Sequence, residues 1–127
     1  MTGKTVESVD NRGYHAHIYY EVKSTRGVAE RLCAAIEAEF SVEIVGFRDE
    51  LRGPHPISNV LVIFEGDQFE RVVPYLMLNR GDLDVLVHPL TDDAVLDHSD
   101  YAIWLGTPVP LKLHTLPHAR AGQLPAA

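Results

Sequence analysis

The feature of this sequence that most constrains its fold is the order in which the spacing of its apolar residues changes. Apolar residues at every second position are typical of a half-buried strand, whereas apolar residues at every third or fourth position are typical of an amphipathic helix. Along the 127 residues the spacing indicates strand, helix, strand, strand, helix and strand. The six segments are residues 14–20, 25–40, 42–47, 59–64, 67–80 and 84–88.

This order predicts an α+β fold, a ferredoxin-like βαββαβ sandwich in which a four-stranded antiparallel sheet carries both helices on one face. We expect one domain over residues 1–127, with a core at 14–106 and an extended, proline-bearing tail at 107–127 as a C-terminal extension. The free face of the sheet predicts either a homodimer or a cap made by the C-terminal segment. Pro74 predicts either a kinked second helix or a helix that begins near that proline.

Composition narrows the classes of partner and compartment. The net charge of −7 argues against binding to nucleic acid or to an anionic membrane surface. The polar N-terminus has no apolar signal segment and no later apolar run reaches membrane-spanning length, so we expect a cytoplasmic protein. Cys33 is the single cysteine, which excludes an intramolecular disulfide and a thiolate metal cluster, and we interpret it as a buried apolar residue.

Four of the seven histidines occupy positions that this topology brings to one place. His15 and His17 point to the same side of the first strand, because residues two apart on a strand share a face. His88 ends the fourth strand, and His55 lies between two prolines in the loop that leads into the third. We expect the third strand to run parallel beside the first and the fourth to run antiparallel beside it, which would bring these positions together.

His15, His17, His55 and His88 are therefore candidate metal ligands, and the sequence leaves open which three bind directly. Imidazole ligands suit iron, zinc, copper or nickel and disfavour magnesium or calcium. Taken singly, each motif has a simpler interpretation, since His-x-His is often only a polar strand face and a histidine between prolines is often only part of a rigid loop.

The segment from Asp97 to Asp100 contains a fifth candidate histidine, His98, with a carboxylate neighbour in sequence. A histidine in that setting suits a general acid or base, although a solvated turn is the simpler interpretation. His114 and His118 lie in the proline-bearing tail, where we expect surface residues.

Five short motifs, in order along residues 14–106, resemble the DOPA 4,5-dioxygenase family. They are Tyr14-His15-Ala16-His17-Ile18-Tyr19-Tyr20, Gly53-Pro54-His55-Pro56, Leu76-Met77-Leu78-Asn79-Arg80-Gly81, Val85-Leu86-Val87-His88-Pro89, and Asp97-His98 followed by Trp104-Leu105-Gly106. The family is understood as small ferredoxin-like proteins, whose characterised fungal and bacterial members open catechol rings next to the diol with non-haem iron(II) and dioxygen.

The resemblance implies iron(II) as the cofactor, with zinc or nickel as other occupants of the site in a purified sample. It also implies a small DOPA-like or caffeate-like catechol and O2 as substrates. In this scheme His98 shuttles a proton, and Arg80, Asn79 or Arg52 contacts the substrate. Thr91-Asp92-Asp93 departs from the family pattern by added charge, which we expect to alter substrate preference.

Two other functions are consistent with the same residues. A zinc-loaded imidazole site would activate water, which would make the protein a metal-dependent enzyme of another type. A dimeric ferredoxin-like protein could instead bind a small ligand without dioxygenase activity.

Overall fold

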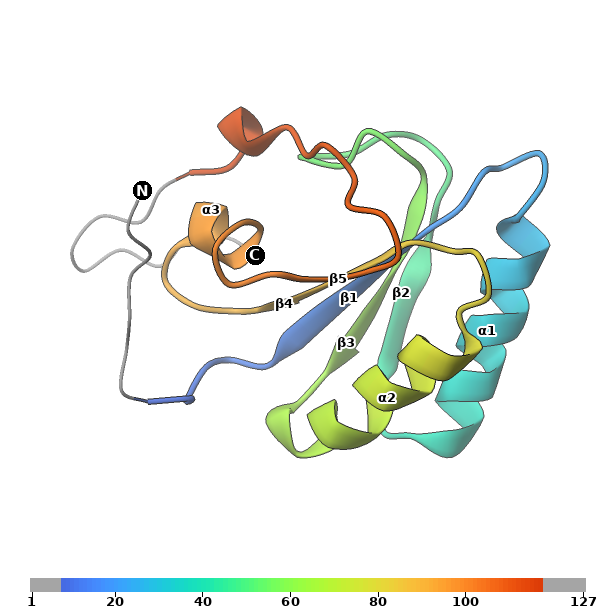
Figure 1. Ribbon diagram of the computed structural model, residues 1–127, viewed down its shortest axis with the longest axis horizontal. Helices are drawn as coiled ribbons and strands as arrows, with labels where there is room; N and C mark the ends of the chain where they lie inside the picture. Colours follow the sequence, from blue (N-terminus) through green and yellow to red (C-terminus); the bar gives the residue numbers. More distant parts are fainter. Residues whose placement is uncertain (1–7, 118–127) are drawn as a thin grey trace.

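The computed structural model describes residues 8–117, which form an α+β fold around one antiparallel sheet (Figure 1). The strands are β1 (Tyr14–Tyr19), β2 (Glu43–Arg48), β3 (Asn59–Phe64), β4 (Val85–Pro89) and β5 (Ile103–Leu105). The helices are α1 (Arg26–Glu39), α2 (Phe69–Asn79) and the short α3 (Ala94–Asp97), with 3-10 turns at Gly66–Gln68 and Leu113–Thr115.

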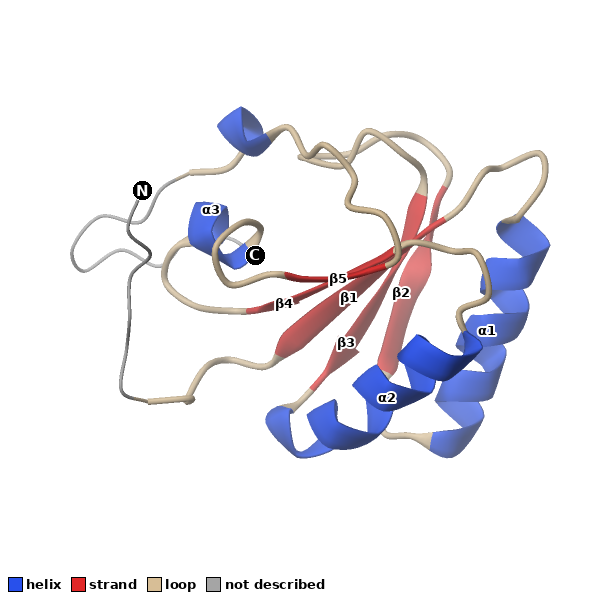
Figure 2. Ribbon diagram, viewed as in Figure 1, coloured by secondary structure: helices blue, strands red, loops and turns tan. Residues whose placement is uncertain are grey.

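The sheet has five strands in the order β2-β3-β1-β4-β5, which corrects the predicted four (Figure 2). The first four strands and the two long helices follow the predicted order along the chain. The fifth strand pairs with β4 from Val85 opposite Leu105 to Val87 opposite Ile103. It was missed because three residues are too few to display a period of two.

The central strand β1 runs antiparallel to both of its neighbours, β3 and β4. Tyr14 lies opposite Phe64 and Tyr19 lies opposite Asn59. The prediction that the first and third strands run parallel was therefore wrong, because the β2–β3 hairpin reverses the chain after the α1 crossover. The loop before β3, which carries His55, consequently starts at the far end of β1 from His15.

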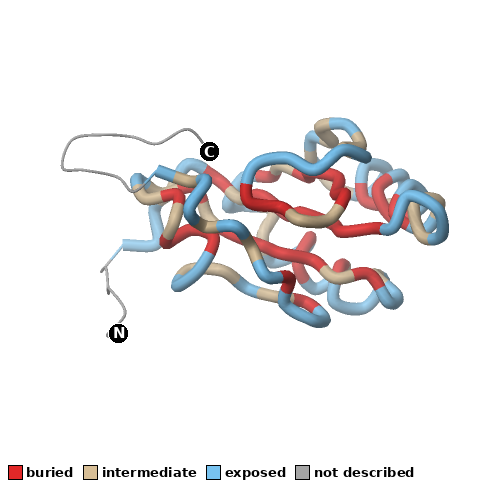
Figure 3. Tube along the Cα trace, turned by 90° about the horizontal axis from the view of Figure 1, so that it is seen from above, coloured by how far each residue is buried: buried red, intermediate tan, exposed pale blue. Residues whose placement is uncertain are grey.

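Helices α1 and α2 pack on one face of the sheet and enclose the main core. Ala16 and Ile18 of β1 point into this core and are fully buried, as are Ile36 of α1 and Leu76 of α2. The buried residues follow the strands and the inward faces of the helices (Figure 3).

The opposite face is covered by other parts of the same chain. The loop at residues 49–58, helix α3 and residues 107–112 lie on the side away from α1 and α2 (Figure 1). The Lys112 amide donates to the Pro54 carbonyl at 2.8 Å, and Val109 packs in a small cluster with Tyr19 and Leu86. Of the two predicted covers, the C-terminal segment is present at residues 107–112, and the homodimer stays a prediction, as does the extended tail.

Helix α2 passes through Pro74, so it does not begin there. Proline cannot donate to the Glu70 carbonyl one turn earlier. Pro74 and Glu70 are both on the exposed side, where water can satisfy that carbonyl. The hydration of one carbonyl explains why the helix tolerates the proline.

Cys33 is buried in α1, as predicted, and burial raises the pKa of its thiol to about 12. Within residues 8–117, no helix combines the length and the apolar character needed to cross a membrane. The cytoplasmic location stays a prediction. His118 lies outside the described residues, and His114 is exposed as expected.

The packing of α2 generates a first prediction. Leu76→Ala, which removes a fully buried side chain, is expected to lower the free energy of unfolding by about 2–5 kcal/mol. Leu78→Ala is the matched control, because Leu78 lies two residues away on the same helix and is 84% exposed, and we expect a change below about 0.5 kcal/mol. Urea denaturation measures both. Equal losses in the two variants would contradict the described docking face of α2.

Candidate metal centre

Five histidines meet on the sheet face opposite the long helices. Each is at most 8% exposed. They are His15 and His17 of β1, His88 of β4, His55 of the 49–58 loop and His98 at the end of α3. The structure thus brings together the four predicted ligand candidates and the predicted acid–base residue.

Strand pairing places three of the rings. His15 lies directly opposite His88 in the β1–β4 pair, with ring centroids 5.2 Å apart. His17 is two residues further along the same face, 5.9 Å from the His15 ring and 5.2 Å from the His88 ring. This part of the site follows from sheet geometry alone, because directly paired residues and i, i+2 residues share a face.

The loop that carries His55 reaches the cluster from a different end of the sheet than predicted. It folds back across the sheet, so the His55 ring lies 4.1 Å from that of His17, centroid to centroid. A tight turn holds it, in which the His55 amide donates to the Arg52 carbonyl at 3.0 Å and Gly53 adopts a φ of 54°. The Tyr19 hydroxyl lies 2.7 Å from His55 Nδ1. The histidine rings therefore lie together as predicted, although the predicted direction of the third strand was wrong.

Hydrogen bonds made by Asp93 and Asp97 hold the turn around α3 that carries His98. The Asp93 side chain caps α3 by accepting from the Leu96 amide at 3.1 Å, and Asp97 accepts from the Thr91 amide at 3.0 Å. The His98 ring lies 4.0 Å from that of His88 and is 6% exposed. The solvated turn, which was the simpler interpretation, is therefore wrong for Asp97 and His98, which are buried, although Ser99 and Asp100 are exposed.

Hydrogen bonds assign the proton positions on three of the rings. The Nδ1 atoms of His17, His88 and His98 each face an oxygen that can only accept, at 2.7–3.0 Å. These oxygens are Asn59 Oδ1, the Pro89 carbonyl and the Ala94 carbonyl. Each Nδ1 must therefore donate, which leaves a lone pair on Nε2 of the neutral ring.

The Nε2 atoms of His17 and His88 face one another at 3.2 Å. Because both carry lone pairs, no proton lies between them, and a shared cation would relieve their repulsion. A metal at about 2.0–2.1 Å from each imidazole nitrogen, with ligand angles between square and tetrahedral, places the two nitrogens roughly 2.9–3.4 Å apart. The observed separation therefore fits a pair of metal ligands.

Two sets of three histidines have ligand atoms within 4.8 Å of one another. One set is His15, His17 and His88, and the other is His17, His55 and His98. All are buried imidazoles, so either set could hold a transition metal. The first set contains the facing Nε2 pair.

Burial keeps these rings neutral at pH 7. It lowers the pKa of His15 and of His55 to about 4 and that of His88 to about 2, with neighbouring positive charges as further causes. The pKa values of His17 and His98 are lowered as well, again chiefly by burial. Neutral imidazoles are the form that binds metal.

A cavity of about 200 Å³ opens onto this cluster. A cavity of about 150 Å³ already admits benzene, so the space suits one small substituted ring. Its walls include four of the histidines, Leu61 and Leu116, and two arginines, Arg48 and Arg52. Arg52 was among the predicted substrate contacts, whereas Arg48 was not.

Asn79 and Arg80 are not brought to the histidines. They lie at the C-terminal end of α2, in the helix layer on the other side of the sheet. The Asn79 amide donates to the Tyr75 carbonyl, and Arg80 donates to the carbonyls of Gly81 and Leu83. Their side chains thus close the end of the helix, and the expectation that they contact a substrate at this cluster is not supported.

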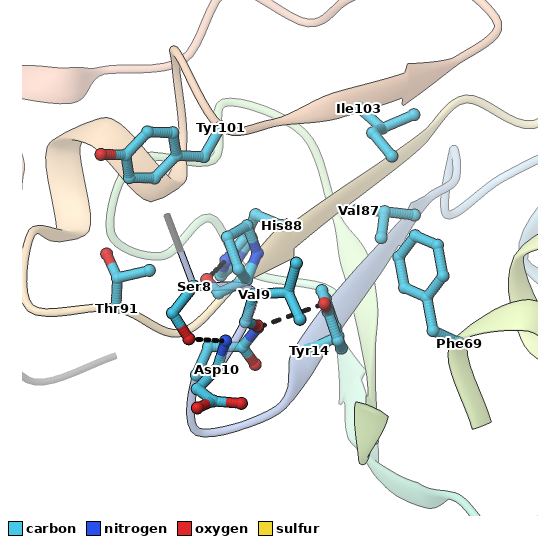
Figure 4. A pocket seen from close by; sticks show the side chains of 12 residues that line it. Ser8, Val9, Asp10, Tyr14, Phe69, Val87, His88, Thr91, Tyr101 and Ile103 are labelled. Atoms are coloured by element: carbon cyan, nitrogen blue, oxygen red, sulfur yellow. Dashed lines mark hydrogen bonds between the residues drawn. The ribbon is translucent and has the colours of Figure 1, made fainter. Parts of the chain in front are cut away.

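A second cavity, of about 270 Å³, lies between the segment from Ser8 to Asn11 and the end of β4 (Figure 4). Tyr14, Phe69 and Ile103 give it a largely apolar wall. His88 is the one histidine that lines it, so it lacks the convergent nitrogens of the first cavity. The chemistry therefore points to the smaller cavity.

The sheet, its one-sided helix layer and the buried imidazoles on the other face define a small α+β protein with a histidine cluster that could bind a metal. The chain belongs to the Dopa 4,5-dioxygenase family, whose model matches residues 14–115. The resemblance seen in the five motifs is thus confirmed, and the match extends into the segment that covers the site.

Individual relatives agree with this assignment. The chain is 37% identical over 124 residues to an uncharacterised 21.2 kDa protein of Botryotinia fuckeliana, covering 87% of this chain and 68% of that protein. It is 30% identical over 122 residues to a DOPA 4,5-dioxygenase of Amanita muscaria, covering 90% of this chain but only 54% of that protein. The crystal structure of a dioxygenase candidate from Nostoc punctiforme superposes with a TM-score of 0.83 at 41% identity, covering 87% of this chain and 96% of that one.

The lowered histidine pKa values predict an acid-sensitive fold. A histidine whose pKa falls from 6.5 when unfolded to about 4 when folded contributes stability that is complete above pH 6.5 and is lost as pH falls towards 4. We expect the urea midpoint of the metal-free protein to fall between pH 7 and pH 5, and to fall less in His15→Gln. His114→Gln is the control, because this side chain is exposed, and its fall should match that of the wild type. An equal fall in His15→Gln would contradict the assignment.

Proposed function

We propose that this protein is a non-haem iron(II) dioxygenase of the extradiol type, which opens the ring of a small catechol with O2. The observation that carries the proposal is the pair of unprotonated Nε2 atoms of His17 and His88, 3.2 Å apart, in a cluster whose His17 also lines a cavity of single-ring size. Membership of the Dopa 4,5-dioxygenase family supports the reaction class. We regard the fold as a ferredoxin-like core extended by β5.

In this proposal His15, His17 and His88 hold the metal through their ring nitrogens. Iron held there would supply the redox coupling between an anionic catechol and dioxygen. The acceptors on Asn59 and Pro89 hold the His17 and His88 rings with Nε2 towards the metal. His55, the fourth predicted ligand, belongs to the second set and faces the substrate space.

In this proposal His98 moves the proton. Its Nδ1 donates to the Ala94 carbonyl, so its Nε2 has a lone pair that can accept a proton from a catechol hydroxyl. The reaction breaks the ring bond next to the diol, both atoms of O2 enter the product, and the proton held by His98 returns to that product. Leu61 and Leu116 supply apolar walls that limit the access of water.

The activity test uses the full chain, loaded with iron(II) under anaerobic conditions. Addition of L-DOPA or caffeate and then air is expected to consume oxygen and to give a yellow ring-opened product. His17→Ala is expected to lose bound iron and activity together, because it removes one of the facing ligands. His114→Ala, on the exposed surface, serves as the control.

Three outcomes would decide against the proposal. If no catechol in a broad panel causes oxygen uptake, the proposed dioxygenase activity is rejected. Hydrolysis by the zinc-loaded protein, without oxygen uptake by the iron-loaded protein, would favour a metal-dependent enzyme of another type. Unchanged small-ligand affinity in a His17→Ala, His88→Ala double variant would favour a binding protein without catalysis.

A separate prediction tests the ring anchors. Asn59→Ala removes the acceptor that holds His17, and outer contacts of this kind are worth about 10–100-fold in metal affinity. We therefore expect iron(II) or zinc(II) affinity, measured by competition with a chelating dye, to fall by that factor. Asn79→Ala, at the exposed end of α2, is the matched control and should leave affinity unchanged. Wild-type affinity in Asn59→Ala would contradict the assignment of His17 as a ligand.

A further inference from the structure

Two arginines line the histidine cavity with their charges uncompensated. Within residues 8–117, neither Arg48 nor Arg52 forms an ion pair or a side-chain hydrogen bond; the two ion pairs of this region both belong to Arg26. Asp49, the acidic residue next to Arg48 in sequence, is held elsewhere by Tyr20 and Arg26. Guanidinium groups that are unpaired at a cavity are available to an anionic ligand.

A β-bulge turns Arg48 towards the histidines. Val45 lies opposite Leu61 and Phe47 lies opposite Val60, so Gly46 is an extra residue in β2, with a φ of 57°. In a regular strand, with Gly46 paired like its neighbours, Val45 and Phe47 would share a face. With the bulge, Phe47 packs in the helix-side core and Arg48, opposite Asn59, faces the cavity. Bulges commonly re-aim side chains beside active sites.

The loop turn positions the second arginine. Arg52 and His55 form an isolated antiparallel bridge, so the turn that delivers the His55 ring also sets the Arg52 backbone. Arg48 comes from β2 and Arg52 from the loop, and both line the same cavity.

We infer that Arg48 and Arg52 form a carboxylate-binding pair that selects an anionic catechol and orients its ring, with the diol towards the histidines. This rests on the proposed function and adds a specificity element to it. In a chain with a net charge of −7, general electrostatics repel an anion, so local guanidinium contacts must supply the selectivity. The substrate class is a catechol whose side chain carries a carboxylate.

The test compares two ligands of equal size, 3,4-dihydroxyphenylacetate and its amide, binding to the iron(II)-loaded full chain without oxygen. Titration calorimetry is expected to show tighter binding of the acid by about tenfold or more, the contribution of one charged hydrogen bond. Arg48→Met should remove this preference by weakening the acid alone, and Arg48→Lys should keep part of it. Arg31→Met, an exposed charge on α1, is the control for net charge and should change neither ligand.

Arg52→Met provides an independent variant. The Arg52 side chain is exposed, so its replacement does not disturb the packing of the core. Equal affinity of the wild type for acid and amide would overturn the inference. So would an equal weakening of both ligands in Arg48→Met and Arg52→Met, with thermal unfolding midpoints used to confirm that each variant is folded.

A second pair of probes separates this inference from the dioxygenase proposal. Phenylacetate and phenylacetamide lack the diol, and titration of the metal-free chain prevents the carboxylate from binding a metal. A phenylacetate preference that depends on Arg48 supports the arginine pair even if no catechol is opened. If the rate of ring opening depends neither on the substrate carboxylate nor on Arg48→Met, the dioxygenase proposal stands and the carboxylate-binding arginine pair is rejected.

Discussion

The site depends on the pairing of β1 with β4. That register sets His15 directly opposite His88 and leaves His17 on the same face, and the backbone hydrogen bonds of the central strands make the arrangement rigid. Three basic side chains are thus forced together in a buried place, where protonation of any of them is penalised by burial and by its neighbours. Acceptors that hold Nδ1 of His17 and His88 then leave two lone pairs face to face, an arrangement that favours a cation.

Everything else at the site is added to this frame by irregular segments. The 49–58 loop contributes His55, and the turn at α3 contributes His98. The segment after β5 completes the cover of this face through the hydrogen bond between Lys112 and Pro54. A rigid sheet carrying the proposed ligands, with loops carrying the proposed acid–base and selectivity groups, allows substrate preference to change while the metal site stays constant. The bulge at Gly46 extends the same division to β2, because one extra residue decides which side chain enters the cavity.

Much of this could be predicted from patterns in the chain. Residues at positions i and i+2 of a strand share a face, so the relation between His15 and His17 needed only the recognition of the strand. The positions of His55 and His98 needed knowledge of how two loops fold over the sheet. Arg48 was missed because a regular strand would turn it towards the helices. Asn79 and Arg80 lie away from the histidines; their motif shows that residues recur together without showing what they contact.

The sequence by itself determined the order of the first four strands and the two long helices, the imidazole character of the site and the family, because these depend on local periodicity and on contiguous motifs. The tertiary structure alone decided the antiparallel direction of β3, the fifth strand, the proton positions on the rings and the turn of Arg48 into the cavity. Those features depend on which distant residue lies opposite which. Spacing along one chain does not contain that information.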